Sequence, residues 1–417
     1  MRKILIVGAG QAGLQLGLSL RAEGYDVTIA SPRTAEEIRS GGITSTQVLF
    51  GPALATERAY GLDHWAESAP GIRGLRLSLA APPGTLALAL NGELDETASS
   101  VDQRIAFARW LTDAQDQGIE VIHQPVTPAE LDTWTAEGRY DLVVVAAGKG
   151  DLTGLFTRDA ARSPYAEPQR GLAVAYVHGL APDPAFPETH VGFNAIPGLG
   201  ELFVIPLLTL SGPAHALFWE AVPGGPLDRW ASGPSATPAE HLAVTLELAR
   251  EYLPWVHERT AGVELADARA TLSGRYTPTV RHPVAHLPGG GFVLGLGDVL
   301  IANDPITGQG SNTAAKAAAH YLRAILDHGD RPFDAEWATA TFETFWSAHG
   351  EIVTGWTNAM LQPLPPHIQQ ILGAAASLPP VARRFANGFA DPNDFASWLL
   401  DPSSAEAYLT EVATAAA

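Results

Sequence analysis

A short glycine-rich turn between an apolar strand and a helix is the feature that most restricts how this chain can fold. Residues 4–7 are apolar and rich in β-branched side chains, which favours a parallel strand covered on both faces. Three glycines follow at once within residues 8–13, and a leucine-rich helix then runs as far as Gly24. Residues 26–30 predict a second strand. This order is typical of a dinucleotide-binding unit.

Each glycine of this turn has its own expected task. Gly8 allows the tight turn off the strand, Gly10 lets a pyrophosphate approach the backbone, and Gly13 lets the helix pack against the strand. The N–H groups at the helix start, around Gln11 and Ala12, would attract phosphates with the help of the helix dipole. Glycines also serve ordinary tight turns, but the flanking strand and helix favour the nucleotide role.

The acidic residue that usually holds the adenosine ribose, about 20 positions further on, is missing. The chain has Ser31, Pro32 and Arg33 in that region. Arg33 is a candidate for contact with a phosphate or with adenine, and it could equally be a solvated surface side chain. The missing carboxylate predicts a weaker hold on the adenosine half and removes the usual marker of NAD preference.

A second glycine-rich segment lies far downstream. Gly297 and Asp298 end an apolar strand, and residues 304–312 form a turn that leads into an alanine-rich helix. Asp298 could accept hydrogen bonds from a polyol chain, and the helix N-terminus would stabilise negative charge such as that of a reduced flavin. Asp298 could also be a plain turn residue. The cofactor-binding residues predicted here are Gly297, Asp298, Pro305, Gly308, Gln309, Gly310, Ser311 and Asn312.

Length and composition exclude several classes of protein. The chain has 417 residues, which at roughly 150 per domain predicts two or three domains. Its 26 Lys+Arg against 45 Asp+Glu give a net charge of −19, which argues against nucleic-acid binding. With no cysteine, disulfides and thiolate metal sites are excluded, and the histidines suggest no metal site either. We find no membrane-spanning run or signal peptide, and we expect a cytoplasmic protein.

The pattern of elements predicts an α/β fold with an inserted sheet. We expect a discontinuous FAD-binding domain with a parallel sheet, over residues 1–75, 99–162 and 276–330. Strands alternating with Pro/Gly turns predict an antiparallel substrate-binding sheet domain over residues 76–98 and 163–275. Residues 331–417 look helical, and we interpret residues 40–100 as largely irregular.

Together these segments resemble a known family. Gly8 to Gly13, Gly297-Asp298 and Pro305 to Asn312 are similar to the para-hydroxybenzoate-hydroxylase-type FAD fold, and more closely to the two-component styrene and indole monooxygenases. Residues 163–170 also fit this family. The resemblance implies that a separate NADH-dependent flavin reductase supplies FADH2, which reacts with O2 to a C4a-(hydro)peroxide. One oxygen then passes to a vinyl bond, an indole or a sulfide. The C-terminal helices are candidates for a homodimer surface.

The resemblance also suggests residues on the substrate side. Ser45, Gln47, Leu49 and Phe50 are similar to the Ser-x-Gln-x-Met-Phe pattern of the indole-preferring branch, with Leu49 in place of Met. Ser45 and Gln47 could offer hydrogen bonds to a substrate N–H or to the flavin peroxide, while Leu49 and Phe50 would form an apolar wall. Gln47 could instead be a loop residue that packs on a turn. Arg104 would pair with FAD phosphate or fix its own helix.

Two other functions remain open at this stage. One is a single-component FAD hydroxylase that uses NAD(P)H directly, and the other is a non-catalytic FAD-binding protein. The glycine cluster at residues 148–154 could be offered as a pyridine-nucleotide site, but no apolar helix follows it. An outside source of electrons is therefore favoured.

Overall fold

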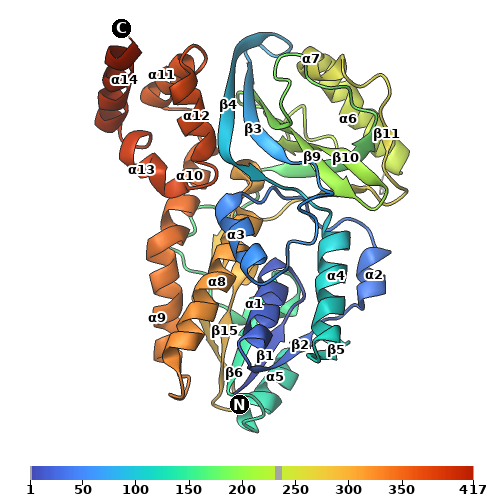
Figure 1. The fold of residues 1–417 in the computed structure, drawn as a ribbon, viewed down its shortest axis with the longest axis vertical. Helices are drawn as coiled ribbons and strands as arrows, with labels where there is room; N and C mark the ends of the chain where they lie inside the picture. Colours follow the sequence, from blue (N-terminus) through green and yellow to red (C-terminus); the bar gives the residue numbers. More distant parts are fainter. Residues whose placement is uncertain (1, 231–236, 417) are drawn as a thin grey trace.

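The computed structural model describes residues 2–230 and 237–416, and it contains two large sheets (Figure 1). The first has six strands in the order β14-β15-β6-β1-β2-β5. Its strands are β1 (Lys3–Val7), β2 (Asp26–Ala30), β5 (Glu120–Ile122), β6 (Leu142–Val145), β14 (Val284–His286) and β15 (Phe292–Gly295). All neighbours pair in parallel except β14 and β15. This is the parallel sheet that the first thirty residues predicted.

Helices cover this parallel sheet and bury its apolar strands. Ile4, Leu5 and Ile6 of β1 have no exposed surface, as a strand covered on both faces requires. Helices α1 and α8 lie side by side against the sheet (Figure 1). The helices of this region are α1 (Gln11–Ala22), α2 (Ala35–Arg39), α3 (Gly51–Ala59), α4 (Gln103–Asp116), α5 (Pro128–Ala136), α8 (Gly310–His328) and α9 (Ala335–Phe345).

The second sheet has eight strands, in the order β11-β7-β10-β9-β8-β3-β4, with β12 also pairing β7. Its strands are β3 (Ile72–Ala80), β4 (Leu86–Ala98), β7 (Gly171–His178), β8 (His190–Ile196), β9 (Gly200–Thr209), β10 (Gly212–Ala221), β11 (Glu264–Leu265) and β12 (Thr271–Gly274). The pairing is antiparallel apart from β3 with β8. Two short strands, β13 (Thr279–Val280) and β16 (Ile301–Ala302), pair separately, after the chain has left β12.

The two faces of the second sheet are covered by different helices. Apolar side chains of α6 (Pro238–Tyr252) and α7 (Pro254–His257) pack on one face. The C-terminal helices join the core on the other face, and α12 packs tightly on β4, since a Cβ on Gly92 would lie 2.3 Å from the Ala382 carbonyl oxygen. These helices are α10 (Glu351–Met360), α11 (Pro366–Ala375), α12 (Pro379–Asn387), α13 (Phe395–Trp398) and α14 (Pro402–Ala416).

The structure confirms the predicted fold class and corrects one stretch of it. A parallel sheet, a separate and mainly antiparallel sheet and a helical C-terminal region are all present. The interpretation of residues 40–100 as largely irregular was wrong, because α3 and the long strands β3 and β4 lie there. β3 begins at Ile72, inside the range predicted for the FAD-binding domain. None of the described helices has the length and apolar character needed to cross a membrane.

Candidate functional site

The two glycine-rich turns, almost 300 residues apart in the sequence, meet in space. A Cβ placed on Gly297 would lie 3.2 Å from the Cβ of Ala12. One turn further along both helices, the Gln15 side-chain amide donates to the carbonyl oxygen of Ala315 at 3.0 Å. The N-terminal ends of α1 and α8 are therefore neighbours, and residues from both turns can contact one extended ligand.

The first turn has the close approaches that the glycine pattern predicted. Gly8 has φ of 122°, and a Cβ there would lie 2.7 Å from the backbone of Ala146. A Cβ on Gly13 would lie 2.1 Å from the carbonyl oxygen of Gly8, so only glycine permits this contact between helix and strand. A Cβ on Gly10 would meet no described atom within 4 Å apart from those of its chain neighbours. The backbone at Gly10 is open to a pyrophosphate, and the turn fits the predicted ligand.

The helices at the site lack the caps that other helices of the molecule have. Capping boxes satisfy the first turns of α2, α5 and α6, through Thr34, Thr127 and Thr237. In the part of the chain that the structure describes, the N-cap residues of α1 and α8, Gly10 and Gln309, make no side-chain cap hydrogen bond. The N–H groups of both first turns are thus available to an anion or a polarised carbonyl.

Asp298 lies at the point where the two turns meet. It belongs to a short 3-10 helix, η2 (Gly297–Val299), and a Cβ on Gly148 would lie 2.7 Å from its own Cβ. The side chain is exposed, yet desolvation by the surrounding protein raises the pKa of its carboxyl group to about 6. Gly308 and Gly310 are exposed as well.

Two residues predicted to contact the cofactor are buried and already hydrogen-bonded. Asn312 accepts from the Phe50 N–H at 3.0 Å and donates to the carbonyl oxygens of Val48 and Gly308. The Gln309 side chain donates to the carbonyl oxygen of Phe389 at 2.9 Å. Both side chains therefore shape the loop between them, whereas Ser311 and Pro305 are half-buried.

Gln11, in the first turn, has a buried acidic partner that sequence reasoning missed. Its side-chain amide donates to Glu57 of α3 at 2.8 Å and to Gln15 at 3.1 Å. Glu57 is 3% exposed, and burial raises the pKa of its carboxyl group to about 8. The sequence around Glu57 does not indicate that this side chain is buried beside Gln11, because the contact joins residues 46 positions apart.

The predicted substrate-side segment is fixed by hydrogen bonds from several elements. Ser45 is exposed, and its carbonyl oxygen accepts from the buried Tyr176 hydroxyl at 3.0 Å. Gln47 is buried, donates to the carbonyl oxygen of Val101 at 2.7 Å and accepts from Gln103 at 3.0 Å. Its side chain thus has the contacts of a loop-packing residue, which was the alternative reading. Leu49 and Phe50 are buried in apolar clusters.

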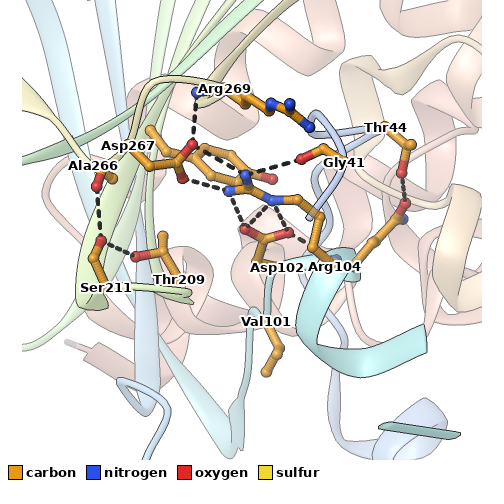
Figure 2. A network of polar contacts seen from close by, with 12 residues as sticks. Gly41, Thr44, Val101, Asp102, Arg104, Thr209, Ser211, Ala266, Asp267 and Arg269 are labelled. Atoms are coloured by element: carbon orange, nitrogen blue, oxygen red, sulfur yellow. Dashed lines mark hydrogen bonds and ion pairs between the residues drawn. The ribbon is translucent and has the colours of Figure 1, made fainter. Parts of the chain in front are cut away.

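Arg104 links the start of α4 to the connection before β12, next to this segment, as Figure 2 shows. Its guanidinium lies between Asp102, at the start of α4, and Asp267, which precedes β12, with contacts of 2.6 and 2.7 Å. It also contacts the carbonyl oxygen of Gly41 at 3.5 Å. These partners hold the positive charge and raise the pKa of the guanidinium. Arg104 therefore has the contacts of a residue that fixes its own helix. Arg33, the other arginine predicted to contact the cofactor, is exposed.

A buried group of acids lies between the second turn and the second sheet. Glu201 and Glu220 stand opposite each other on β9 and β10, and Arg170 makes a two-pronged salt bridge with Glu201 at 2.8 and 3.0 Å. Glu220 is fully buried, and neither carboxylate oxygen has a partner among the described residues. Burial and the charge of Asp304 raise the pKa of Glu220 well above its usual value. The sequence signal that could have revealed this buried group is an acidic residue, Glu220, within an otherwise apolar strand.

Comparisons with known proteins find relatives that match nearly the whole chain. Residues 148–259 match the family model described as "Styrene monooxygenase A putative substrate binding domain". The styrene monooxygenase StyA of Pseudomonas fluorescens is 30% identical over 406 residues, which cover 94% of this chain and 93% of that protein. A StyA from another Pseudomonas is 29% identical over the same coverage.

Solved structures share the fold at much lower identity. The flavin-dependent brominase Bmp2 has a TM-score of 0.62 at 15% identity and covers 92% of this chain and 98% of its own. The myxobacterial chondrochloren halogenase CndH has a TM-score of 0.63 at 14% identity, with 97% and 92% coverage. Identities this low show a common fold alone, whereas the match along nearly the whole of StyA shows the family. The chain therefore belongs to the styrene monooxygenase family of flavin-dependent monooxygenases.

Proposed function

We propose that this protein is the oxygenase component of a two-component flavin monooxygenase, which receives reduced FAD from an NADH-dependent flavin reductase and epoxidises indole or styrene-like aromatic alkenes. The observation that carries the proposal is the meeting of two uncapped helix N-termini, those of α1 and α8, where Gly297 packs between Ala12 and Ala314 and Asp298 follows it. An extended dinucleotide with an anionic ring system suits such paired helix ends, because they carry a partial positive charge. Sulfides would be further substrates of the same oxidant.

The accessible groups of the site are those we assign to the cofactor. The backbone from Gly8 to Gly13 would hold the pyrophosphate, and the Asp298 carboxylate would accept from the ribityl hydroxyls. The backbone around Gly308 and Gly310 would face the isoalloxazine edge. Gln11, Gln309 and Asn312 would act indirectly, since their side chains are committed to other residues. The roles of Arg33 and Arg104 toward FAD phosphate stay predictions.

The reaction needs electrons, an oxygen atom and a dry apolar space. Bound reduced FAD would supply two electrons and two protons, so that one atom of O2 leaves as water while the other enters the substrate double bond. The chain's own task is to orient an apolar substrate and exclude water. The exposed Ser45 and the apolar Leu49 and Phe50 form the segment that we assign to the substrate side.

An outside reductase is favoured by the structure around the other glycine cluster. After Gly148 and Gly150 the chain enters a five-residue 3-10 helix, η1 (Asp151–Leu155). A second dinucleotide site would place a long helix directly after such a turn. In this cluster Gly148 packs closely against Asp298 instead, so we assign its backbone to the same FAD site.

Product analysis tests the proposal directly. The purified protein is mixed with FAD, a flavin reductase, NADH and either indole or styrene. We expect oxygenated product, as blue pigment from indole or as styrene oxide, only when the reductase is present. Pigment without styrene oxide would establish the indole preference that the Ser45–Phe50 segment suggests. Steady NADH consumption without reductase would overturn the two-component assignment.

The role of Asp298 is tested by binding. Asp298→Ala removes the charged acceptor, and we expect reduced FAD to bind about 10- to 100-fold more weakly, which corresponds to one charge-assisted hydrogen bond. In the wild type, affinity should fall as pH drops through about 6, where the Asp298 carboxyl takes up a proton. Asp298→Asn should flatten this dependence. Asp116→Ala, at an exposed position, is the matched control, and equal affinities in both alanine variants would remove Asp298 from the site.

A further inference from the structure

Ser45 and Gln47 lie in a stretch of the chain that has no regular structure. Helix α2 ends at Arg39 and α3 begins at Gly51, and residues 40–47 between them form neither helix nor strand. A backbone of this kind keeps one conformation where other parts of the fold bind its polar groups. The partners of this 40–47 stretch therefore decide where Ser45 and Gln47 lie.

The second sheet supplies several of these partners. From the connection between β11 and β12, the Arg269 side chain donates to the carbonyl oxygen of Ser40, and the Arg269 carbonyl oxygen accepts from the Ile43 N–H at 3.4 Å. From β7, the buried Tyr176 hydroxyl donates to the carbonyl oxygen of Ser45 at 3.0 Å. The backbone of the stretch is thus attached to the second sheet at three positions.

One carboxylate, that of Asp267, holds this connection in place, as Figure 2 shows. It accepts from the N–H of Arg269 at 2.7 Å and from both terminal nitrogens of the Arg104 guanidinium, at 3.1 and 2.7 Å. The nitrogen at 3.1 Å also contacts the carbonyl oxygen of Gly41 at 3.5 Å, and the other bonds Asp102 at 2.6 Å. Asp267 therefore links the connection, the start of α4 and the stretch through two arginines.

The buried guanidinium depends on this carboxylate. The Arg104 side chain is 2% exposed, so its positive charge is balanced by Asp102 and Asp267 rather than by water. Without the Asp267 charge, each terminal nitrogen loses one strong bond. We expect the guanidinium to shift toward Asp102 and to release the carbonyl oxygen of Gly41.

From these contacts we propose that Asp267 is a positioning residue, which acts through Arg104 and Arg269 to hold the 40–47 stretch in the conformation that the substrate meets. The inference rests on the proposed function, because it takes Ser45 and Gln47 to lie on the substrate side. A displacement of about 1 Å at such a position can change a rate by up to about 100-fold. Asp267 acts indirectly, since its carboxylate oxygens are already bonded to the two arginines.

Three variants test this role by kinetics. Asp267→Asn removes the charge at nearly unchanged size, and Asp267→Glu keeps a carboxylate. Asp394→Asn is the matched control, because Asp394 makes the same kind of paired contact with Arg384, at 2.9 and 2.7 Å, in the C-terminal region. With FAD, reductase, NADH and styrene, Asp267→Asn should raise KM about tenfold, the lower end of what a hydrogen bond to a charged group contributes. Affinity for reduced FAD should stay at the wild-type value. Asp267→Glu should restore most of the loss, and Asp394→Asn should leave KM unchanged.

Hydrogen exchange separates this inference from the proposed function, because it needs no turnover. Mass spectrometry follows the backbone amides of residues 40–47 in the full-length protein. Exchange should be about tenfold faster in Asp267→Asn and unchanged in Asp394→Asn. Arg269→Ala changes an exposed residue and removes the bond to Ser40. It should give the same change to a smaller extent, and it decides the question if Asp267→Asn does not fold.

The two measurements give distinct outcomes. If wild type oxygenates neither styrene nor indole, the proposed function fails, while the exchange rates still decide whether Asp267 positions the 40–47 stretch. Wild-type exchange rates in a folded Asp267→Asn protein overturn the inference. So does a lower melting temperature with an unchanged KM, because that is the result of a carboxylate that contributes to stability alone.

Discussion

At the scale of single residues, Glu57 is a buried carboxyl group whose pKa the folded protein raises. It is 3% exposed, and burial raises its pKa from 4.5 to about 8. The native state therefore holds a proton that the unfolded chain releases near pH 4.5, so the stability linked to Glu57 is present at acid pH and lost as pH rises toward 8. Because Glu57 accepts a hydrogen bond from Gln11, its loss of a proton changes the charge next to the first glycine-rich turn.

Glu57→Gln should remove this pH dependence while keeping an oxygen acceptor for Gln11. We expect the variant to match the free energy of unfolding of the wild type near pH 5. At pH 9 it should exceed it by roughly 2–4 kcal/mol, which is somewhat less than the whole shift of the Glu57 pKa corresponds to. Urea denaturation at both pH values measures the difference. Glu36→Gln, at an exposed position on α2, serves as the control. A gap between Glu57→Gln and wild type that is the same at pH 5 and pH 9 would contradict the prediction.

At the scale of elements, Asn312 of α8 fixes a segment that has almost no regular structure of its own. Its side chain bonds the Phe50 N–H at 3.0 Å, the Val48 carbonyl oxygen at 2.8 Å and the Gly308 carbonyl oxygen at 3.1 Å. Val48 and Phe50 are both 6% exposed, so water cannot replace these bonds easily. One helix residue thus couples residues 48–50 to the 304–312 turn.

We expect Asn312→Ala to cost about 2–4 kcal/mol, because it leaves buried backbone groups of both neighbours without a partner. Chemical denaturation measures this loss, and weaker binding of FAD should accompany it, since Gly308 is released as well. Asn393→Ala changes an exposed asparagine whose side chain bonds Asp391, and should cost little. A similar stability for the two variants would show that segment 48–50 is held by its apolar contacts instead.

The elements that sequence reasoning predicted are those with local patterns. The strand, turn and helix over residues 4–22 could be predicted because the glycines and the apolar run lie within a few positions of each other. The turn before α8 could be predicted for the same reason. Residues 76–98 were assigned to the sheet domain, but β3 and β4 were not recognised as separate strands. Leucines alternate along both, yet the surrounding glycines and prolines obscured the pattern.

The parts of the site that could not be predicted depend on contacts between distant residues. The Gln47 side chain is occupied by Val101 and Gln103, more than 50 positions away. Arg104 finds its second carboxylate in Asp267, 163 positions away. Nothing in the local sequence of a loop indicates which polar groups the rest of the fold will bring to it. Residue types therefore indicated the two glycine-rich turns, but not the hydrogen bonds that fix Gln47 and Arg104.

At the scale of the whole molecule, one apolar cluster connects all three regions of the chain. It contains Phe50 and Ile306 from around the candidate site, Phe203 from the second sheet, and Trp356 and Phe389 from the C-terminal helices. The Phe389 ring lies 4.9 Å from Trp356 and 6.4 Å from Phe50, between ring centroids. Multidomain chains often unfold in separate steps, but a shared core opposes that behaviour.

We therefore expect the C-terminal helices and the candidate flavin site to unfold together. Trp356 is 2% exposed, and Trp356→Ala should cost about 3–5 kcal/mol by leaving a cavity where the three regions meet. Calorimetry should show one transition in both proteins, with a lower midpoint in the variant, while Leu326→Ala stays close to wild type. FAD binding, followed during the same heating, should be lost at the midpoint of that transition. If the helices melted first and left binding intact, the shared core would be a contact surface between independent units, and the C-terminal region would not support the site.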